Sequence, residues 1–218
     1  MMMSLLTMDN KTPAYVNTSY SAVTVGNSIT FDYPTDSRYG DLIIAHITSE
    51  NRVLPNVPTG WTTVYSNTTT DATGPATARL LISNIRGEDT SATVNVSGGG
   101  NVICTALRNF LNVINPNTQF SVNSTSSRAS SYTVANTRQM YVVMVSHDGG
   151  NTASPTINIS TTVGAPSPGA NVIYSYNNST PFRAMAMAYC ITEATSNTVN
   201  VNMSADKAWG VEFYVSAT

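Results

Sequence analysis

The sequence is poor in charge. Lysine, arginine, aspartate and glutamate make up 10% of its 218 residues, and the formal net charge is −2. A surface that binds nucleic acid or anionic lipid needs clustered Lys and Arg, and the sequence has no such cluster. The hydrophobic fraction of 41% is too high for a disordered chain. We therefore expect a folded protein that binds neither nucleic acid nor a membrane.

Residues that usually carry out catalysis are also scarce. Of the two histidines, His46 lies in an apolar run, and His147 is followed by Asp148 on a predicted strand, where neighbours point to opposite faces. No Gly-x-Ser-x-Gly motif marks a serine nucleophile. The twelve acidic residues are scattered, without the evident pair that glycoside hydrolysis uses. We predict that the protein is not an enzyme and has no catalytic residues.

Potential metal ligands and cysteines are few and separated. A zinc site needs Cys and His at short spacing, and Cys104 and Cys190 stand alone. Calcium would require several carboxylates in one loop, whereas residues 32–36 and 88–89 supply two each. Each cysteine lies in an apolar predicted strand, so we expect two buried free thiols rather than a disulfide. No metal site and no cofactor are expected.

The sequence contains an internal repeat. Residues 90–96 read Thr-Ser-Ala-Thr-Val-Asn-Val, and residues 195–201 read Thr-Ser-Asn-Thr-Val-Asn-Val. Further similar segments occur in the same order in both parts of the chain, with spacings that drift by a few residues. The additional pairs are 41–45 with 139–143, 54–55 with 154–155, 64–66 with 173–175, and 78–81 with 182–185. We infer a duplication, with halves at about residues 28–115 and 131–218.

The polar and apolar pattern predicts β-strands nearly throughout. Ile29, Phe31 and Tyr33 alternate with polar residues, which is typical of a strand with one buried face. The continuous apolar runs at 42–47 and 140–145 are typical of central strands that are covered on both faces or lie at an interface. Glycine and proline clusters separate these segments. The predicted fold class is all-β, an antiparallel, jelly-roll-like β-sandwich built from two similar halves.

The two halves could form one sandwich or two small domains. The join at 117–131 is rich in Ser and Asn, as a linker would be. Apolar residues nevertheless keep alternating through and beyond it, which favours strands. A jelly roll consists of two Greek keys, so it accommodates a duplication within one sandwich. We predict an N-terminal arm at 1–20 and a single β-sandwich domain at 21–218, with two small domains as the alternative.

Three segments resemble a known family. Residues 40–45 read Gly-Asp-Leu-Ile-Ile-Ala, residues 58–64 read Pro-Thr-Gly-Trp-Thr-Thr-Val, and residues 78–81 read Ala-Arg-Leu-Leu. They resemble β-sandwich modules of bacteriophage virion structural proteins and bacterial surface proteins, which open with Gly-Asp-Leu-Leu and carry a Pro-x-Gly-Trp turn. The resemblance implies a structural or adhesive role, and it brings no shared catalytic residues.

The start of the chain and its composition bear on localisation. The first residues lack the positive segment, apolar core and cleavage site of a signal peptide, so we expect none. Ser, Thr and Asn nevertheless make up more than a third of the chain, as in many extracellular β-modules. A virion protein, assembled in the host cytoplasm and exposed after lysis, satisfies both observations.

With the resemblance, these observations predict a non-enzymatic structural component of a bacteriophage virion. A capsid decoration or particle-surface appendage protein is the favoured form. Its expected partners are other virion proteins and further copies of itself. The alternative is a receptor-binding or carbohydrate-binding module of a tail fibre, which would contact a host-surface glycan.

Two segments are candidate contact sites. The first combines aromatic rings with amides, which suits a glycan or a protein partner, although a solvated hairpin loop is the plainer interpretation. Its residues are Tyr174, Tyr176, Asn177 and Asn178. The second is the apolar part of the N-terminal arm, which we expect to be ordered by a neighbouring subunit. Its residues are Leu5, Leu6, Met8 and Tyr15.

Overall fold

A computed structural model of the chain describes most of it between residues 13 and 217. Every helix or strand in this described part is a β-strand, and every strand pairing is antiparallel, so the all-β prediction is confirmed. Within it there is accordingly no helix long and apolar enough to cross a membrane. The described residues are 13–23, 26–49, 53–68, 77–84, 89–122, 127–133, 139–148, 156–161, 171–179, 182–192, 198–204 and 208–217.

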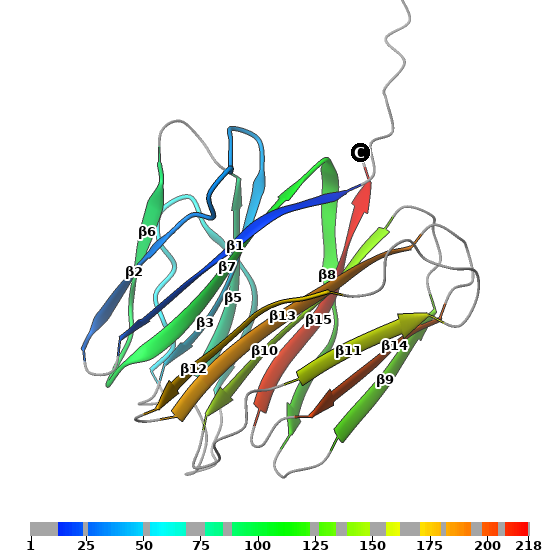
Figure 1. Ribbon diagram of the computed structural model, residues 1–218. Helices are drawn as coiled ribbons and strands as arrows, with labels where there is room; N and C mark the ends of the chain where they lie inside the picture. Colours follow the sequence, from blue (N-terminus) through cyan, green and yellow to red (C-terminus); the bar gives the residue numbers. More distant parts are fainter. Residues whose placement is uncertain are drawn as a thin grey trace, which may run out of the picture.

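The first half of the chain forms two sheets (Figure 1). A five-stranded sheet has the order β1-β7-β3-β5-β4, and a two-stranded sheet pairs β2 with β6. The strands are β1 (Ala14–Val23), β2 (Ser28–Asp32), β3 (Leu42–Ser49), β4 (Thr62–Thr68), β5 (Thr77–Asn84), β6 (Ser91–Asn95) and β7 (Gly100–Arg108).

The second half also forms a five-stranded sheet and a smaller one (Figure 1). The large sheet has the order β12-β13-β10-β15-β8, and the small sheet has the order β11-β14-β9. The strands are β8 (Phe110–Val122), β9 (Ser127–Thr133), β10 (Gln139–Asp148), β11 (Thr156–Thr161), β12 (Asn171–Ser179), β13 (Phe182–Thr192), β14 (Thr198–Ser204) and β15 (Ala208–Ala217).

The strand order is the same in the two halves. When β8, β10, β12, β13 and β15 are matched with β1, β3, β4, β5 and β7, the two five-stranded sheets have identical orders. The β9-β14 pair matches β2-β6, with β11 added at its edge. A register shift also recurs, between Thr63 and Tyr65 in β4 and between Val172 and Tyr174 in β12. The shared topology and the shared irregularity show two similar halves, which run from β1 to β7 and from β8 to β15 rather than over the predicted residues 28–115 and 131–218.

One of the predicted segment pairs is wrong. Leu80 pairs with Tyr65 across β4 and β5, and Met187 pairs with Tyr174 across β12 and β13. Because Tyr65 and Tyr174 follow equivalent register shifts, Leu80 corresponds to Met187. The counterpart of 78–81 therefore begins three residues later than predicted. A shift by an odd number of residues reverses the faces of a strand, so only the observed register keeps buried residues buried.

Residues on β3 alternate between two buried clusters. Leu42 and Ile44 belong to a cluster, here called the inter-sheet core, that combines residues of both five-stranded sheets. Ile43, Ala45 and Ile47 belong to a second cluster, the first-half core, shared with β2 and β6. The buried residues of the inter-sheet core are Leu42, Ile44, Tyr65, Ile103, Leu107, Met140, Val142, Met144, Met185, Met187 and Val215.

The sheets therefore form more layers than the two of the predicted sandwich. The β2-β6 sheet covers one face of the first large sheet, the two large sheets face each other, and the β11-β14-β9 sheet lies beyond the second (Figure 1). Both faces of β3 and of the 140–144 part of β10 are buried. This explains their continuous apolar runs and confirms that they are covered on both faces.

Residues 14–20 of the predicted arm belong to the first large sheet. β1 begins at Ala14, and Tyr15 pairs with Leu107 of β7. The Tyr15 ring stacks on Tyr189 of the second half, with the ring centroids 5.0 Å apart. Tyr15 thus contacts its own chain. Leu5, Leu6 and Met8 lie outside the described residues, and their contact with a neighbouring subunit stays a prediction.

Gly100 is expected to tolerate no side chain. A Cβ built on Gly100 would lie 2.2 Å from the backbone oxygen of Thr48 on β3, so Gly100→Ala must push two central strands apart. We expect a loss of about 3 kcal/mol in the free energy of unfolding, measured by urea denaturation. Gly40→Ala is the control, because Gly40 has a φ of +87° but no atom within 4 Å of an added Cβ. Its cost should be about 1–2 kcal/mol, and an equal loss in both variants would contradict the prediction.

Candidate functional site

The four residues of the predicted aromatic and amide patch lie on β12, an edge strand of the second large sheet, rather than in a hairpin loop. Tyr174 and Tyr176 pair with Met187 and Met185 of β13. Positions 176 and 178 share one face of the strand, whereas position 177 lies on the other. Their side chains lie outside the described residues, so contact with a partner stays a prediction.

Burial lowers the reactivity of the histidine and the thiols that the structure describes. His46 is fully buried on β3, and loss of solvation lowers its pKa to about 4. Neither of its ring nitrogens has a hydrogen-bond partner in the described part of the chain. Cys104 and Cys190 are buried free thiols, as predicted, and burial raises the pKa of Cys190 to about 12. The thiolate form, which is the nucleophile, is therefore disfavoured at neutral pH.

Metal ligands do not come together in the described residues. No group of three or more His, Cys, Asp and Glu side chains in that part of the chain could hold a metal ion. The most distinctive polar structure there is an ion pair between Arg108 and Asp41, beneath the loop that joins β2 to β3.

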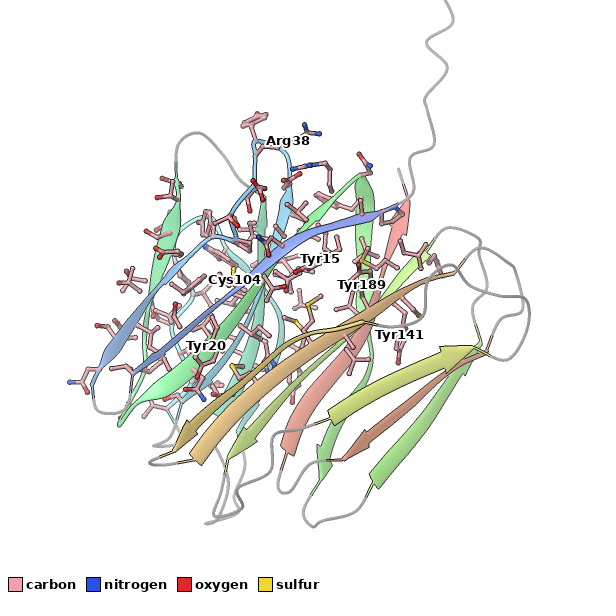
Figure 2. All side chains as sticks on the ribbon, viewed as in Figure 1. Tyr15, Tyr20, Arg38, Cys104, Tyr141 and Tyr189 are labelled. Atoms are coloured by element: carbon pink, nitrogen blue, oxygen red, sulfur yellow. The ribbon has the colours of Figure 1, made fainter. Side chains whose placement is uncertain are left out.

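The loop that joins β2 to β3, residues 33–41, presents the most exposed of the large apolar side chains on the described surface. Tyr39 is 78% exposed, and Arg38 beside it is exposed as well. We call this segment the Tyr39 loop. In Figure 2, Arg38 lies at one end of the first half, away from Tyr189 and the second half.

Two consecutive turns build the Tyr39 loop. The Ser37 N–H donates to the Pro34 carbonyl at 3.2 Å, and the Asp41 N–H donates to the Arg38 carbonyl at 3.0 Å. The third residue of each turn has a positive φ, 68° at Asp36 and 87° at Gly40, as a type II turn requires. Tyr39 is the second residue of its turn, so its side chain projects from a corner of the chain.

One ion pair fixes both turns. Arg108 of β7 donates from Nε to Asp41 Oδ1 at 2.8 Å and from Nη2 to Asp41 Oδ2 at 2.7 Å. Arg108 Nη2 also donates to the Asp36 carbonyl at 3.1 Å, and the Arg38 N–H donates to Asp41 Oδ2 at 3.0 Å. The Asp41 side chain is only 2% exposed, and its hydrogen bonds raise the pKa of Arg108. A bidentate, largely buried pair of this kind holds its groups in a defined geometry.

Aromatic rings support the base of the loop. Tyr33 is half-buried and lies edge-on to Trp61, with centroids 6.1 Å apart, and Trp61 lies edge-on to Phe31 at 5.7 Å. The turn from Pro58 to Trp61, closed by a 3.1 Å hydrogen bond, places the indole there. Trp61 is therefore buried in the first-half core, and it packs against the base of the loop.

The ion pair belongs to the first half alone. Leu42 pairs with Leu107, and their counterparts Met140 and Val215 pair in the second half. The residues next to them, Asp41 and Arg108, therefore correspond to Gln139 and Ser216. The connection from β9 to β10, residues 134–138, is also shorter than the Tyr39 loop.

Sequence reasoning missed the Tyr39 loop as a site. Asp41 belongs to the Gly-Asp-Leu-Ile segment, and no sequence pattern links it to Arg108, 67 residues further along the chain. Two signals were available in the repeat: the greater length of the connection in the first half, and the replacement of a charged pair by Gln and Ser.

Comparison of the chain with known protein families, curated proteins and solved structures gives no match.

Replacing Asp41 and Arg108 by the residue types of their second-half counterparts, Gln and Ser, is expected to reduce the order of the Tyr39 loop. Arg108→Ser alone leaves the buried Asp41 carboxylate without its cation, so we expect a loss of about 3 kcal/mol in the free energy of unfolding. Asp41→Gln with Arg108→Ser removes both charges and should recover at least half of that loss. Urea denaturation measures the stabilities, and hydrogen exchange of residues 36–41 measures the loop. A double variant that is no more stable than Arg108→Ser would show that the pair is not coupled.

Proposed function

We propose that the protein is a non-enzymatic structural component of a bacteriophage virion, either a capsid decoration protein or an appendage on the particle surface. The observation that supports this most is the stacking of the sheets. Both faces of β3 and of the 140–144 part of β10 are used in packing within the chain. The molecule is therefore left with outer sheet faces, strand edges and loops for its external contacts, and these suit docking onto a larger assembly.

The outer face of the β2-β6 sheet is consistent with this role. Its exposed residues are small and polar, with Asp32 the one charged residue among them, and Thr30 and Thr93 face each other across the strands with hydroxyl oxygens 2.9 Å apart. Cross-strand threonine pairs stabilise a sheet without adding charge or a large apolar side chain. Such a surface suits a protein displayed in many copies on a particle, where an apolar outer face would promote aggregation.

Localisation on particles tests the proposal. Antibodies against the purified protein, carrying gold, would be applied to intact particles of the phage that encodes the chain and imaged by electron microscopy. Label spread regularly over the head would support decoration. Label at the tail alone would favour a receptor-binding or carbohydrate-binding module of a tail fibre. Purified particles that lack the protein would overturn the proposed function.

A further inference from the structure

We propose that the Tyr39 loop is the surface through which this protein docks onto its particle, and that the partner is a protein surface that presents a carboxylate beside an apolar hollow. The inference rests on the proposed function, since it names the contact that such a component would use. Arg38 and Tyr39 are the residues that enter the partner.

The loop is built to hold these two side chains in place. Tyr and Arg are enriched among the residues that contribute most to protein interfaces. Tyr39 projects from a turn whose ends are bonded to each other, and Asp41 and Arg108 tie this turn to the preceding one and to β7. Little backbone entropy remains to be lost on binding, which favours a tighter complex.

Divergence between the halves points to the same loop. The two large sheets keep the same strand order and the same register shift, so the scaffold has been retained in both copies. The first half differs in having a longer β2–β3 connection and the pair of Asp41 and Arg108 beneath it. The ion pair bonds to the loop backbone at two places, at Asp36 and Arg38, so part of its role is to shape the loop.

The chemistry of the tip defines the partner. The Asp41 carboxylate, three residues from Arg38, is already occupied by Arg108, and among the described residues Asp41 and Arg108 form the one salt bridge. The Arg38 guanidinium is therefore available, and burying it at an interface without an anion would be costly. The partner must supply a carboxylate for Arg38 and an apolar contact for the Tyr39 ring.

The shape of the tip favours a protein over a saccharide. Tyr39 is 78% exposed, and an added Cβ on Gly40 would meet no atom within 4 Å, so the tip is convex. Small ligands are usually held in concave sites that cover most of their surface. A convex tip gains comparable contact only by entering a hollow in its partner.

Rebinding to particles tests the inference. Particles made without the gene for this chain would be incubated with purified wild-type protein or with Arg38→Ala, Arg38→Glu or Tyr39→Ala, and the bound protein measured after sedimentation over a range of concentrations. We expect each alanine variant to bind about 10- to 100-fold more weakly, and Arg38→Glu to bind more weakly than Arg38→Ala. All three variants change an exposed side chain, so their thermal midpoints should match that of the wild type.

Val53→Ala is the matched control. Val53 is an exposed apolar residue outside the Tyr39 loop, and its variant should bind as the wild type does. Equal binding by wild type and by all Arg38 and Tyr39 variants would overturn this inference and leave the proposed function standing. Failure of the wild type itself to bind would count against the proposed function and remove the inference with it. Binding of wild type, but not of Tyr39→Ala, to a glycan array would show that the Tyr39 loop binds a saccharide, and it would overturn the proposal of a protein partner.

Discussion

Replacing His46 by methionine is expected to stabilise the protein, and to do so more strongly in acid. His46 is fully buried, its ring nitrogens have no hydrogen-bond partner among the described residues, and its pKa is lowered to about 4. It pairs with Ile103, so it lies on the side of β3 that faces the inter-sheet core. The corresponding residue of the second half is Met144, which shows that methionine fits this position of the scaffold.

The direction of the pH effect follows from the lowered pKa. In the unfolded chain His46 takes up a proton near its ordinary pKa of about 6.5, whereas the folded protein resists protonation until about pH 4. Stability is therefore fully present above pH 6.5 and is lost as the pH falls toward 4. Between pH 7.5 and 5 this group alone should remove about 2 kcal/mol from the free energy of unfolding.

Urea denaturation at pH 7.5, 6 and 5 measures the effect. At pH 7.5 the methionine variant should be more stable by about 1–3 kcal/mol, because two unpaired polar atoms have been removed from the interior. The difference should grow by about 2 kcal/mol at pH 5. His147→Gln, which changes the other of the two histidines, should leave the His46 contribution in place. A constant difference between His46→Met and wild type across this range would contradict the interpretation.

The sequence predicted the strands well because their burial is periodic. Ile29 and Phe31 are buried between exposed neighbours, and Val94 and Val96 of the repeated heptapeptide are buried as well. Periodicity reports how many faces of a strand are covered, but not which sheet covers them. The stacking of two large sheets therefore had to come from the three-dimensional arrangement.

The sequence did not predict the Tyr39 loop as a site, for a different reason. A loop has no periodic pattern, and the contacts that shape this one join Asp41 to Arg108, which are far apart in the sequence and are brought together by the pairing of β3 with β7. The repeat contained the information indirectly, in the residues that differ between its copies. The two copies differ in spacing, and for this reason the sequence pattern places the counterpart of segment 78–81 three residues too early.

The two halves are expected to unfold as one unit, and Leu107→Ala tests this most strongly. Leu107 is fully buried in the inter-sheet core, where β3 and β7 of the first half meet β10, β13 and β15 of the second. Truncating a buried leucine removes apolar contacts and leaves a cavity, so we expect a loss of about 2–5 kcal/mol in the free energy of unfolding. Because residues of both halves line that cavity, both halves should lose stability together.

The chain carries one tryptophan in each half, which allows the halves to be followed separately. Trp61 reports on the first half in a Trp209→Phe background, and Trp209 of β15 reports on the second in a Trp61→Phe background. Leu107→Ala should lower the urea midpoint by the same amount with either probe, whereas Ser28→Ala on the exposed face of β2 should change the stability by about 0.5 kcal/mol or less. A shift seen by Trp61 but not by Trp209 would mean that the halves unfold independently. Coincident shifts would instead show that the inter-sheet core makes one cooperative structure out of the two copies.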